Sequence, residues 1–234
     1  MGRLTGVSVA IVRPAEHTGP VVDALVTEGA VPIVVPLVRI VDVAAETVGA
    51  ALADLSARDW VVVTSPNGAD RTAPALAACA ARVAAVGATT ASRLPRVDLV
   101  PAVQRAEGLL AELPAPDPGA RAVVVQSADA HPTLVDRLRD RGWLVERIAS
   151  HRTVTVVPTA EDRARVLAAD ALLLTAGSQA RAWAEVIGTS SPAVVAIGEQ
   201  TARDAVAAGL KVAAIAADHS INGTVEALVK LLRR

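Results

Sequence analysis

The stretch Val61-Val62-Val63-Thr64-Ser65-Pro66-Asn67-Gly68 joins a run of β-branched residues to a polar, turn-forming segment, and an alanine-rich stretch follows. Apolar residues without polar alternation are typical of a buried strand in a parallel sheet. Ser65 is the expected N-cap of the next helix, with Pro66 in its first turn. The stretch therefore predicts hydroxyl and backbone N–H groups at the carboxyl end of a strand, where open α/β sheets bind ligands.

The chain repeats this stretch. Residues 171–181 again give a buried strand, a threonine, a turn of small residues and an alanine-rich helix, and residues 194–202 resemble 83–91 in the same way. Two motifs held at one constant spacing predict an internal duplication. A block that ends at Gly29, where a helix is expected to stop, recurs at Gly142, with a slightly longer spacing that a loop insertion explains. The pairs that share the first spacing are Thr64 with Thr175, Gly87 with Gly198, and Thr90 with Thr201.

Strands alternate with helices through both repeats, which predicts an α/β protein with parallel sheets. Two long extended segments interrupt this alternation, one in the middle of each repeat. We expect them to connect two α/β domains with a cleft between them, in a hinge-bending monomer. The expected first domain is discontinuous and comprises residues 1–37 and 157–234, the second comprises 43–146, and the connectors are 38–42 and 147–156.

Composition excludes several classes of protein. The 234 residues carry a net charge of −1 with no basic block, which argues against general nucleic-acid binding. No apolar run approaches the roughly 20 residues of a membrane helix, and the N-terminus lacks a signal-peptide pattern. A single cysteine, Cys79, cannot form an internal disulfide. We therefore expect a cytoplasmic protein that binds neither membranes nor nucleic acids.

The common signatures of cofactor and metal chemistry are missing. The chain has no G-x-x-x-x-G-K-[ST] loop, and the loops at Gly87 and Gly198 do not fit G-x-G-x-x-G. Its four histidines are scattered and its one cysteine stands alone, so no metal-ligand spacing is present. There is also no G-x-S-x-G elbow. We expect neither a metal nor an organic cofactor.

Hydroxyl-bearing turns remain as the candidate site. Each residue alone is typical of helix capping, and Thr201-Ala-Arg-Asp204 fits a capping box. As a group facing one cleft they suit a ligand with several carboxylates. Arg13, after the first strand, could pair with a carboxylate or be a solvated loop residue, whereas Arg71 and Arg181 are expected on the surface. The hydroxyl residues are Thr64, Ser65, Thr90, Ser127, Thr175, Ser178 and Thr201.

Four features together resemble uroporphyrinogen-III synthase, in the same order and over essentially the whole chain. They are the Thr-Ser-Pro-Asn-Gly-Ala stretch at residue 64, the V-x-x-[VI]-G-x-x-T-A motif of both halves, residues 147–153, and residues 219–228. The resemblance implies two α/β domains joined by two extended strands, and it implies a cyclising lyase without a cofactor. Linear hydroxymethylbilane would lose its hydroxyl group and close to uroporphyrinogen III with ring D inverted. The enzyme that produces hydroxymethylbilane is a candidate partner.

The resemblance also implies residue roles. Thr90 and Thr201 fall on the family's paired Gly-x-x-Thr threonines, where they would help fold the substrate for catalysis. The family usually has a tyrosine, discussed as a proton donor to the leaving hydroxyl, where this chain has His151. A histidine could do the same, or be a partly exposed hinge residue. The expected substrate-binding residues are Arg13, Thr64, Ser65, Asn67, Ser127, Thr175, Ser178 and Gly198, with Ala176 replacing the second serine of the repeat.

A second class of function remains open at this point. Two α/β lobes around a cleft also describe domains that sense or bind solutes without transforming them. Such a module would bind a polycarboxylate but would not catalyse ring closure. Cyclisation of hydroxymethylbilane to the type III isomer discriminates the two possibilities.

Overall fold

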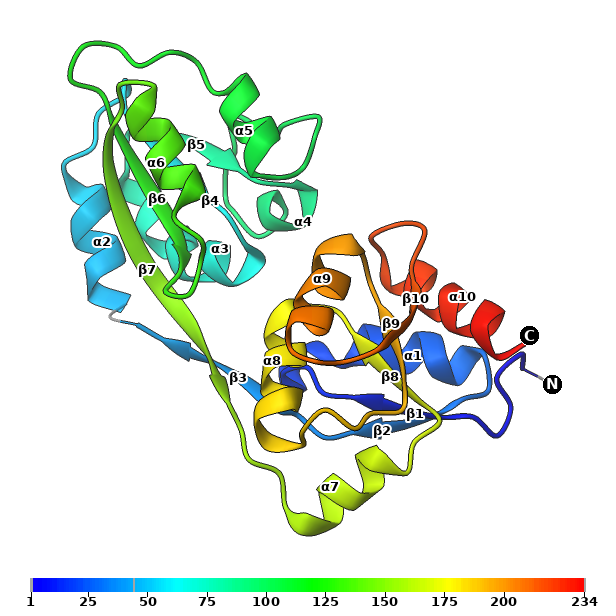
Figure 1. Cartoon of the computed structure of the whole chain (residues 1–234). Helices are drawn as coiled ribbons and strands as arrows, with labels where there is room; N and C mark the ends of the chain where they lie inside the picture. The colour runs from blue at the N-terminus through cyan, green and yellow to red at the C-terminus, as the bar shows by residue number, and fades with distance from the viewer. Residues whose placement is uncertain (1, 44, 234) are drawn as a thin grey trace. The chain divides into compact units, whose positions relative to one another are not determined.

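The computed structural model describes residues 2–43 and 45–233 of the chain. It divides into two compact α/β units, Met1–Ile40 with Thr153–Arg234 and Val41–Arg152. Each unit has one five-stranded sheet covered by helices on both faces (Figure 1). The chain therefore enters the first unit, builds the whole of the second, and returns to complete the first.

The sheet of the first unit is entirely parallel, with the strand order β10-β9-β8-β1-β2. From the neighbouring pair β1 and β8, the chain adds β2 on one side and β9 and β10 on the other. This pair is thus the topological switch point, where ligands bind at the carboxyl ends of strands in open α/β sheets. The strands are β1 (Ser8–Ile11), β2 (Val31–Val34), β8 (Ala171–Leu174), β9 (Ala193–Ala196) and β10 (Val212–Ile215).

Alternate residues of these strands face opposite helical layers. Val9 and Ile11 belong to a core formed with α1 and α10, whereas Ala10 and Val12 belong to the core that contains the fully buried Trp183 of α8. Gly29 follows α1 with φ of 82°, and this left-handed conformation ends the helix. The helical elements are η1 (Ala15–His17), α1 (Gly19–Thr27), α7 (Ala160–Leu167), α8 (Gly177–Val186), α9 (Glu199–Ala207) and α10 (Ile221–Leu232).

The sheet of the second unit has the order β3-β7-β6-β4-β5. Strands β4 to β7 are parallel, with the switch point between β4 and β6. The edge strand β3 is antiparallel, because Val43 donates to Ser150 O while Val156 donates to Leu37 O. The two segments predicted as extended connectors pair with each other at this edge, and the rest of the sheet is parallel as expected. The strands are β3 (Val38–Asp42), β4 (Trp60–Val63), β5 (Arg82–Ala85), β6 (Arg121–Ser127) and β7 (Leu144–Thr155).

Helices also cover both faces of this second sheet. Val61 and Val63 pack with α2, α3 and η2, and Trp60 and Val62 pack with α5 and α6. Gly142, after α6, has φ of 91° and ends that helix as Gly29 ends α1. The helical elements are α2 (Ala45–Ala53), α3 (Pro66–Thr72), η2 (Ala73–Ala78), α4 (Ala88–Ala91), α5 (Ala106–Glu112) and α6 (Thr133–Asp140).

The internal duplication is present in three dimensions. Strands β4 and β5 correspond to β8 and β9, and helices α3 and α4 correspond to α8 and α9, with the same spacing between the two starts in every pair. Strand β7, over 144–155, repeats the segment 31–42 that holds β2 and β3, at the slightly longer spacing that relates Gly29 to Gly142. Equivalent strands also occupy equivalent places in the two sheets. The predicted α/β duplication is confirmed.

The duplication extends to a carboxylate at the amino ends of the strands. Asp59 accepts hydrogen bonds from Arg121 N at 2.8 Å and from Ser56 N and Oγ, both at 2.7 Å. Asp170, its equivalent in the first unit, accepts from Ser8 N and Oγ at 2.8 and 2.7 Å. Each carboxylate thus ties together the two strands of a switch point, at the end opposite to the ligand-binding edge.

None of the helices in the described part of the chain combines the length and apolar character needed to span a bilayer.

Candidate active site

The predicted site residues of the first unit meet at the carboxyl edge of its sheet. Arg13 follows β1 and Thr175 follows β8, and the register Ile11 to Leu173 places both two residues beyond a paired position. Gly198 follows β9 in the same way. Three neighbouring parallel strands therefore deliver an arginine, a threonine and a glycine turn to one edge of the sheet.

Arg13 supplies a cation at this edge of the sheet. Its side chain is half-buried, and Nε and Nη1 are buried without a hydrogen-bond partner among the described residues. Burial lowers the pKa of the guanidinium below its ordinary value. A desolvated charge without a partner is unfavourable, and an anion that reaches it relieves this penalty. The geometry therefore favours an anionic ligand here.

Thr175 is oriented by a glutamine that the sequence analysis did not single out. Gln179 is 3% exposed; its Oε1 accepts from Thr175 N and its Nε2 donates to Thr175 Oγ1, both at 2.9 Å. The hydroxyl hydrogen of Thr175 remains available to a ligand. Ser178 makes no side-chain hydrogen bond within the described chain, and Ala176 leaves the start of α8 without a side-chain cap. The sequence did hold a signal for Gln179, since a polar residue four positions after Thr175 lies one helical turn away from it.

Thr201 is not part of a capping box, so that prediction is wrong. The N-cap of α9 is Gly198, and Thr201 lies inside the first turn of the helix. Asp204 Oδ1 instead accepts from Gln200 Nε2 at 2.9 Å. Thr201 is 4% exposed, and its hydroxyl has no partner in the described part of the chain. A Cβ atom at Gly198 would collide with the imidazole of His219, so glycine allows these two segments to approach.

In the second unit, the residues that follow β4 have defined local bonds. Thr64 donates from N and Oγ1 to Val125 O on β6, at 3.2 and 3.3 Å. Ser65 Oγ accepts from Gly68 N at 3.0 Å, which confirms the predicted N-cap of α3. The side chain of Asn67 makes no hydrogen bond among the described residues. Ser65 keeps its hydroxyl hydrogen available, so capping and ligand binding are compatible at this residue.

Thr90 and Ser127 complete the hydroxyl groups of the second unit. Thr90 lies in α4 after β5, is 2% exposed, and has an unpartnered hydroxyl within the described chain. Ser127 ends β6, and its Oγ accepts from Asp129 N at 3.3 Å. Thr90 and Thr201 are therefore equivalent in position, in burial and in their lack of an internal partner.

His151 is buried in β7 rather than partly exposed. The residue is 4% exposed, and Nδ1 lies 2.9 Å from Ser150 Oγ. Burial, reinforced by the positive charge of Arg71, lowers the pKa of the imidazole below its usual range, while Asp129 and Asp42 oppose this shift. The ring is therefore mainly neutral at pH 7 and can donate only through one N–H.

Arg71 does not lie free on the surface, which corrects the expectation from the sequence. Its side chain is 21% exposed, Nε donates to Asp42 Oδ1 at 2.7 Å, and Nη1 donates to Asn67 O at 2.9 Å. It ties the start of α3 to the edge strand β3. Arg181, 61% exposed, is a surface residue as expected.

We expect isosteric removal of either unpartnered threonine hydroxyl to slow the ring closure that the sequence resemblance implies. Thr90→Val and Thr201→Val keep the side-chain volume but remove a hydrogen-bond donor, which is worth about 1 kcal/mol, or roughly fivefold in rate. Because neither hydroxyl has an internal partner, the thermal stability of the protein should stay the same or rise. Steady-state rates and melting curves test both statements, with Thr189→Val as a control. Wild-type rates in both variants would remove these residues from the site.

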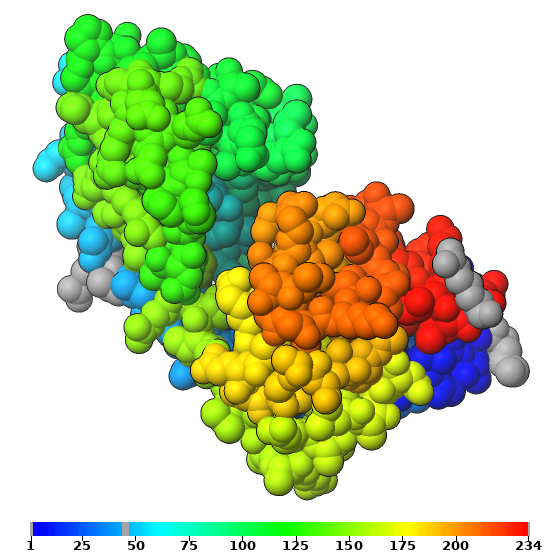
Figure 2. Space-filling model, in the orientation of Figure 1, coloured from blue at the N-terminus to red at the C-terminus, as the bar shows by residue number. Residues whose placement is uncertain are grey.

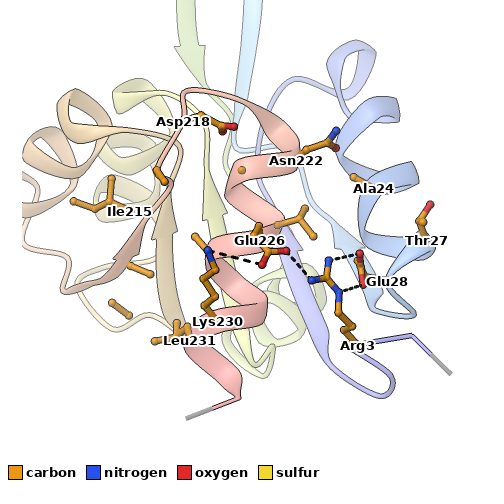
Figure 3. A pocket seen from close by; sticks show the side chains of 16 residues that line it. Arg3, Ala24, Thr27, Glu28, Ile215, Asp218, Asn222, Glu226, Lys230 and Leu231 are labelled. Atoms are coloured by element: carbon orange, nitrogen blue, oxygen red, sulfur yellow. Dashed lines mark hydrogen bonds and ion pairs between the residues drawn. The ribbon is translucent and has the colours of Figure 1, made fainter.

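A large cavity lies elsewhere in the first unit. An open pocket of about 880 Å³ lies between α1, β10 and α10, and most of its charged groups pair with one another (Figure 3). Arg3 bonds to Glu28 and Glu226, at 2.8 and 2.7 Å, and Lys230 lies 3.9 Å from Glu226. The cavity offers no unpaired cation among its described residues, so it is a weaker candidate than the strand edge.

Helix α9 bounds a second hollow with β10. It measures about 740 Å³ and its lining is largely apolar. Figure 2 shows α9 and the segment that leads into β10, coloured orange, on the visible face of the first unit. Val206 of α9 is 61% exposed there.

Among residues 2–43 and 45–233, no group of three or more His, Cys, Asp or Glu side chains could hold a metal ion.

Together, the fold and these donors define a class: a duplicated α/β protein whose two sheets each present hydroxyl groups at a switch point. The first sheet adds a cation that has no partner among the described residues. A family model described as uroporphyrinogen-III synthase HemD matches residues 20–226. The chain belongs to the uroporphyrinogen-III synthase family.

Solved structures agree with this assignment at the level of the fold. A mutant uroporphyrinogen III synthase from the extremely thermophilic bacterium Thermus thermophilus is 20% identical, with a TM-score of 0.64 over 97% of this chain and 99% of that chain. Uroporphyrinogen-III synthetase from Helicobacter pylori 26695 is 15% identical, with a TM-score of 0.65 over 96% of this chain and 99% of that chain. No curated protein matches the chain in sequence.

Proposed function

We propose that this chain is a cyclising lyase that converts hydroxymethylbilane to uroporphyrinogen III. Membership of the uroporphyrinogen-III synthase family places it in tetrapyrrole biosynthesis. The choice of ligand rests on Arg13 at the switch point of the first sheet. Its guanidinium is half-buried and has no counter-ion among the described residues. The substrate has eight carboxylates, which are ionised at neutral pH and can supply that counter-ion.

The reaction is an elimination followed by a ring closure. A proton is transferred to the hydroxyl group of the substrate, the C–O bond breaks, water leaves, and the pyrrole nitrogen stabilises the resulting cation. The substituted carbon of ring D attacks this cation to give a spiro intermediate, which rearranges and closes with ring D inverted. The loss of one proton restores the aromatic ring, so water is the only by-product.

The main task of the protein is to position a flexible substrate. Spontaneous closure joins the unsubstituted carbon of ring D, so the enzyme must favour a more crowded attack. Binding energy from carboxylates remote from the reacting carbons can hold the chain in the required conformation. We assign this binding to Arg13 and to the hydroxyl and amide groups of the strand ends. The remaining members of this set are Thr64, Ser65, Asn67, Ser127, Thr175, Ser178 and Gly198, and we assign Thr90 and Thr201 to the catalytic step.

His151 is the proposed proton donor to the leaving hydroxyl. Its lowered pKa limits the protonated fraction at pH 7 but leaves it able to act as an acid as the pH falls. A neutral imidazole can also donate a hydrogen bond to the hydroxyl oxygen. Because positioning supplies most of the rate in this proposal, the acid is helpful rather than indispensable.

We expect His151→Phe to be impaired, by roughly 10- to 100-fold in kcat, but not inactive. In the wild type, kcat should rise as the pH falls below about 6.5, and the variant should lack this rise. The wild-type protein should lose stability over the same range, because the unfolded chain binds the proton more tightly than the buried ring does. Rate profiles and urea unfolding between pH 5 and 8 test these outcomes, and an unchanged rate would make His151 a structural residue.

The decisive test of the function is cyclisation of enzymatically generated hydroxymethylbilane, with the isomers separated by chromatography. Mostly type III product is the expected result. Type I product alone, the outcome of spontaneous closure, would contradict synthase activity. The comparisons give no support to a sensing module that binds a polycarboxylate without turnover.

We further propose that the chain acts as a monomer on substrate received from the enzyme that makes hydroxymethylbilane. The support is chemical, since the linear substrate closes spontaneously to the wrong isomer when it is free. Analytical ultracentrifugation tests the oligomeric state. Addition of a hydroxymethylbilane trap to the coupled reaction tests direct transfer, which should leave the type III yield unchanged by the trap.

A further inference from the structure

Buried side-chain nitrogens without a hydrogen-bond partner are rare in proteins, and each one calls for an explanation. In the described chain they fall into two groups. Those of Trp60, Arg82 and Trp143 lie at or next to the amino ends of strands in the second unit. Those of Arg13 and Gln126 lie at the carboxyl ends of β1 and β6, the ligand-binding edges of the two sheets.

Arg13 and Gln126 occupy equivalent positions in the duplication. Their spacing along the chain is the same as the spacing between the starts of β1 and β6. Arg13 lies beside Thr175 at the first switch point. Gln126 lies beside Thr64 at the second, where Val125 pairs with Val63. Each half of the molecule thus presents one threonine and one unpartnered nitrogen donor at its switch point.

The amide of Gln126 is more completely buried than the guanidinium of Arg13. The residue is 2% exposed, and Nε2 has no acceptor in the described part of the chain. A glutamine that served only to fill the core would carry this unfavourable desolvation without compensation. A ligand oxygen seated at the strand ends supplies the missing acceptor.

We propose that Gln126 donates a hydrogen bond from Nε2 to a carboxylate of the substrate, and is the neutral counterpart of Arg13 in the second unit. The inference rests on the proposed function for the identity of the ligand. It goes further because it assigns a different ligand-binding group to each half, a cation in the first unit and a neutral amide in the second. A pseudo-symmetric protein can use this difference to bind its asymmetric linear substrate in one direction only.

The test compares Gln126→Leu, Gln126→Arg and Trp143→Phe with the wild type. Leucine has one non-hydrogen atom fewer than glutamine, a similar volume and no polar atoms. Trp143→Phe serves as the matched control, because it removes an unpartnered buried N–H at the amino ends of the strands in the same sheet. Uroporphyrinogen III, kept reduced under anaerobic conditions, is the probe for binding, and thermal melting of the ligand-free protein is measured in parallel.

Gln126→Leu is expected to weaken binding of uroporphyrinogen III about 10-fold, the value of a hydrogen bond to a charged group. It should leave the melting temperature unchanged or higher, because an unsatisfied buried group is lost. Gln126→Arg should bind more tightly than the wild type and with a steeper dependence on salt. Trp143→Phe should bind as the wild type does.

Three results would overturn the proposal: wild-type affinity in Gln126→Leu, a lower melting temperature in that variant, which would reveal an internal partner, or no binding of the probe by the wild type. Failure of the proposed function is a separate outcome. Type I product from the wild type, combined with weakened binding in Gln126→Leu, would reject synthase activity and keep the carboxylate contact.

Discussion

Arg13→Leu is expected to weaken substrate binding by about 100-fold, because a charge-assisted hydrogen bond to a carboxylate is worth up to about 3 kcal/mol. The loss should appear mainly in KM and in the affinity for uroporphyrinogen III. The ligand-free protein should become more stable, since the variant removes a half-buried cation that has no counter-ion among the described residues. A loss of affinity with a gain of stability is the signature of a residue kept for its ligand.

The matched control for Arg13 is Arg181→Leu. It removes the same charge from the same unit, but Arg181 is 61% exposed and only loosely paired with Asp204 at 3.7 Å. Its KM should change less than about twofold, as expected for an exposed ion pair. Equal losses in the two variants would mean that the net charge of the protein, and not a contact at the strand end, governs binding.

Asp59→Ala is expected to destabilise the second unit by about 3 kcal/mol, because its removal leaves the donors of three part-buried hydrogen bonds, from Arg121 and Ser56, without acceptors. The carboxylate is 3% exposed and accepts hydrogen bonds from both of these residues. Urea unfolding followed by tryptophan fluorescence measures the change, with Trp60 as the adjacent reporter. Asp170→Ala, at the equivalent but exposed position, should lose only about 1 kcal/mol.

The lowered pKa of Asp59 also leads us to expect that the stability of the protein depends on pH. Burial raises the pKa of this carboxyl, but the bonds from Arg121 and Ser56 outweigh burial and hold it below its usual range. The unfolded chain therefore takes up a proton before the folded chain does, and stability falls as the pH drops below about 4. Asp59→Ala should show a shallower loss of stability in acid. A wild-type acid profile in the variant would show that other carboxyls dominate.

Local patterns of sequence were enough to predict most of the elements. The apolar runs predicted β4 and β8, Ser65 predicted the start of α3, and Gly29 and Gly142 predicted the ends of two helices. These features depend on residues within one turn or one strand, where sequence neighbours are also spatial neighbours.

Residues 97–100 have the local pattern of a strand but do not form one, and the reason lies in the tertiary structure. They make a single bridge, Leu99 with Ala84. The carboxylate of Asp98 accepts from Val83 N at 2.7 Å and so takes the place of a ladder carbonyl. A side chain that replaces a backbone partner from a distant part of the chain leaves no local signal.

The sequence alone determined the α/β class, the duplication at a constant spacing and the resemblance to the synthase family. Only the tertiary structure decided which of the polar side chains already have a hydrogen-bond partner within the chain. Thr64 is bonded across the sheet to Val125, whereas Arg13 and Gln126 are desolvated without a partner in the described part of the chain. The reason is that desolvation and hydrogen-bond satisfaction depend on groups brought together from distant parts of the chain, and pairing in a parallel sheet always joins such parts.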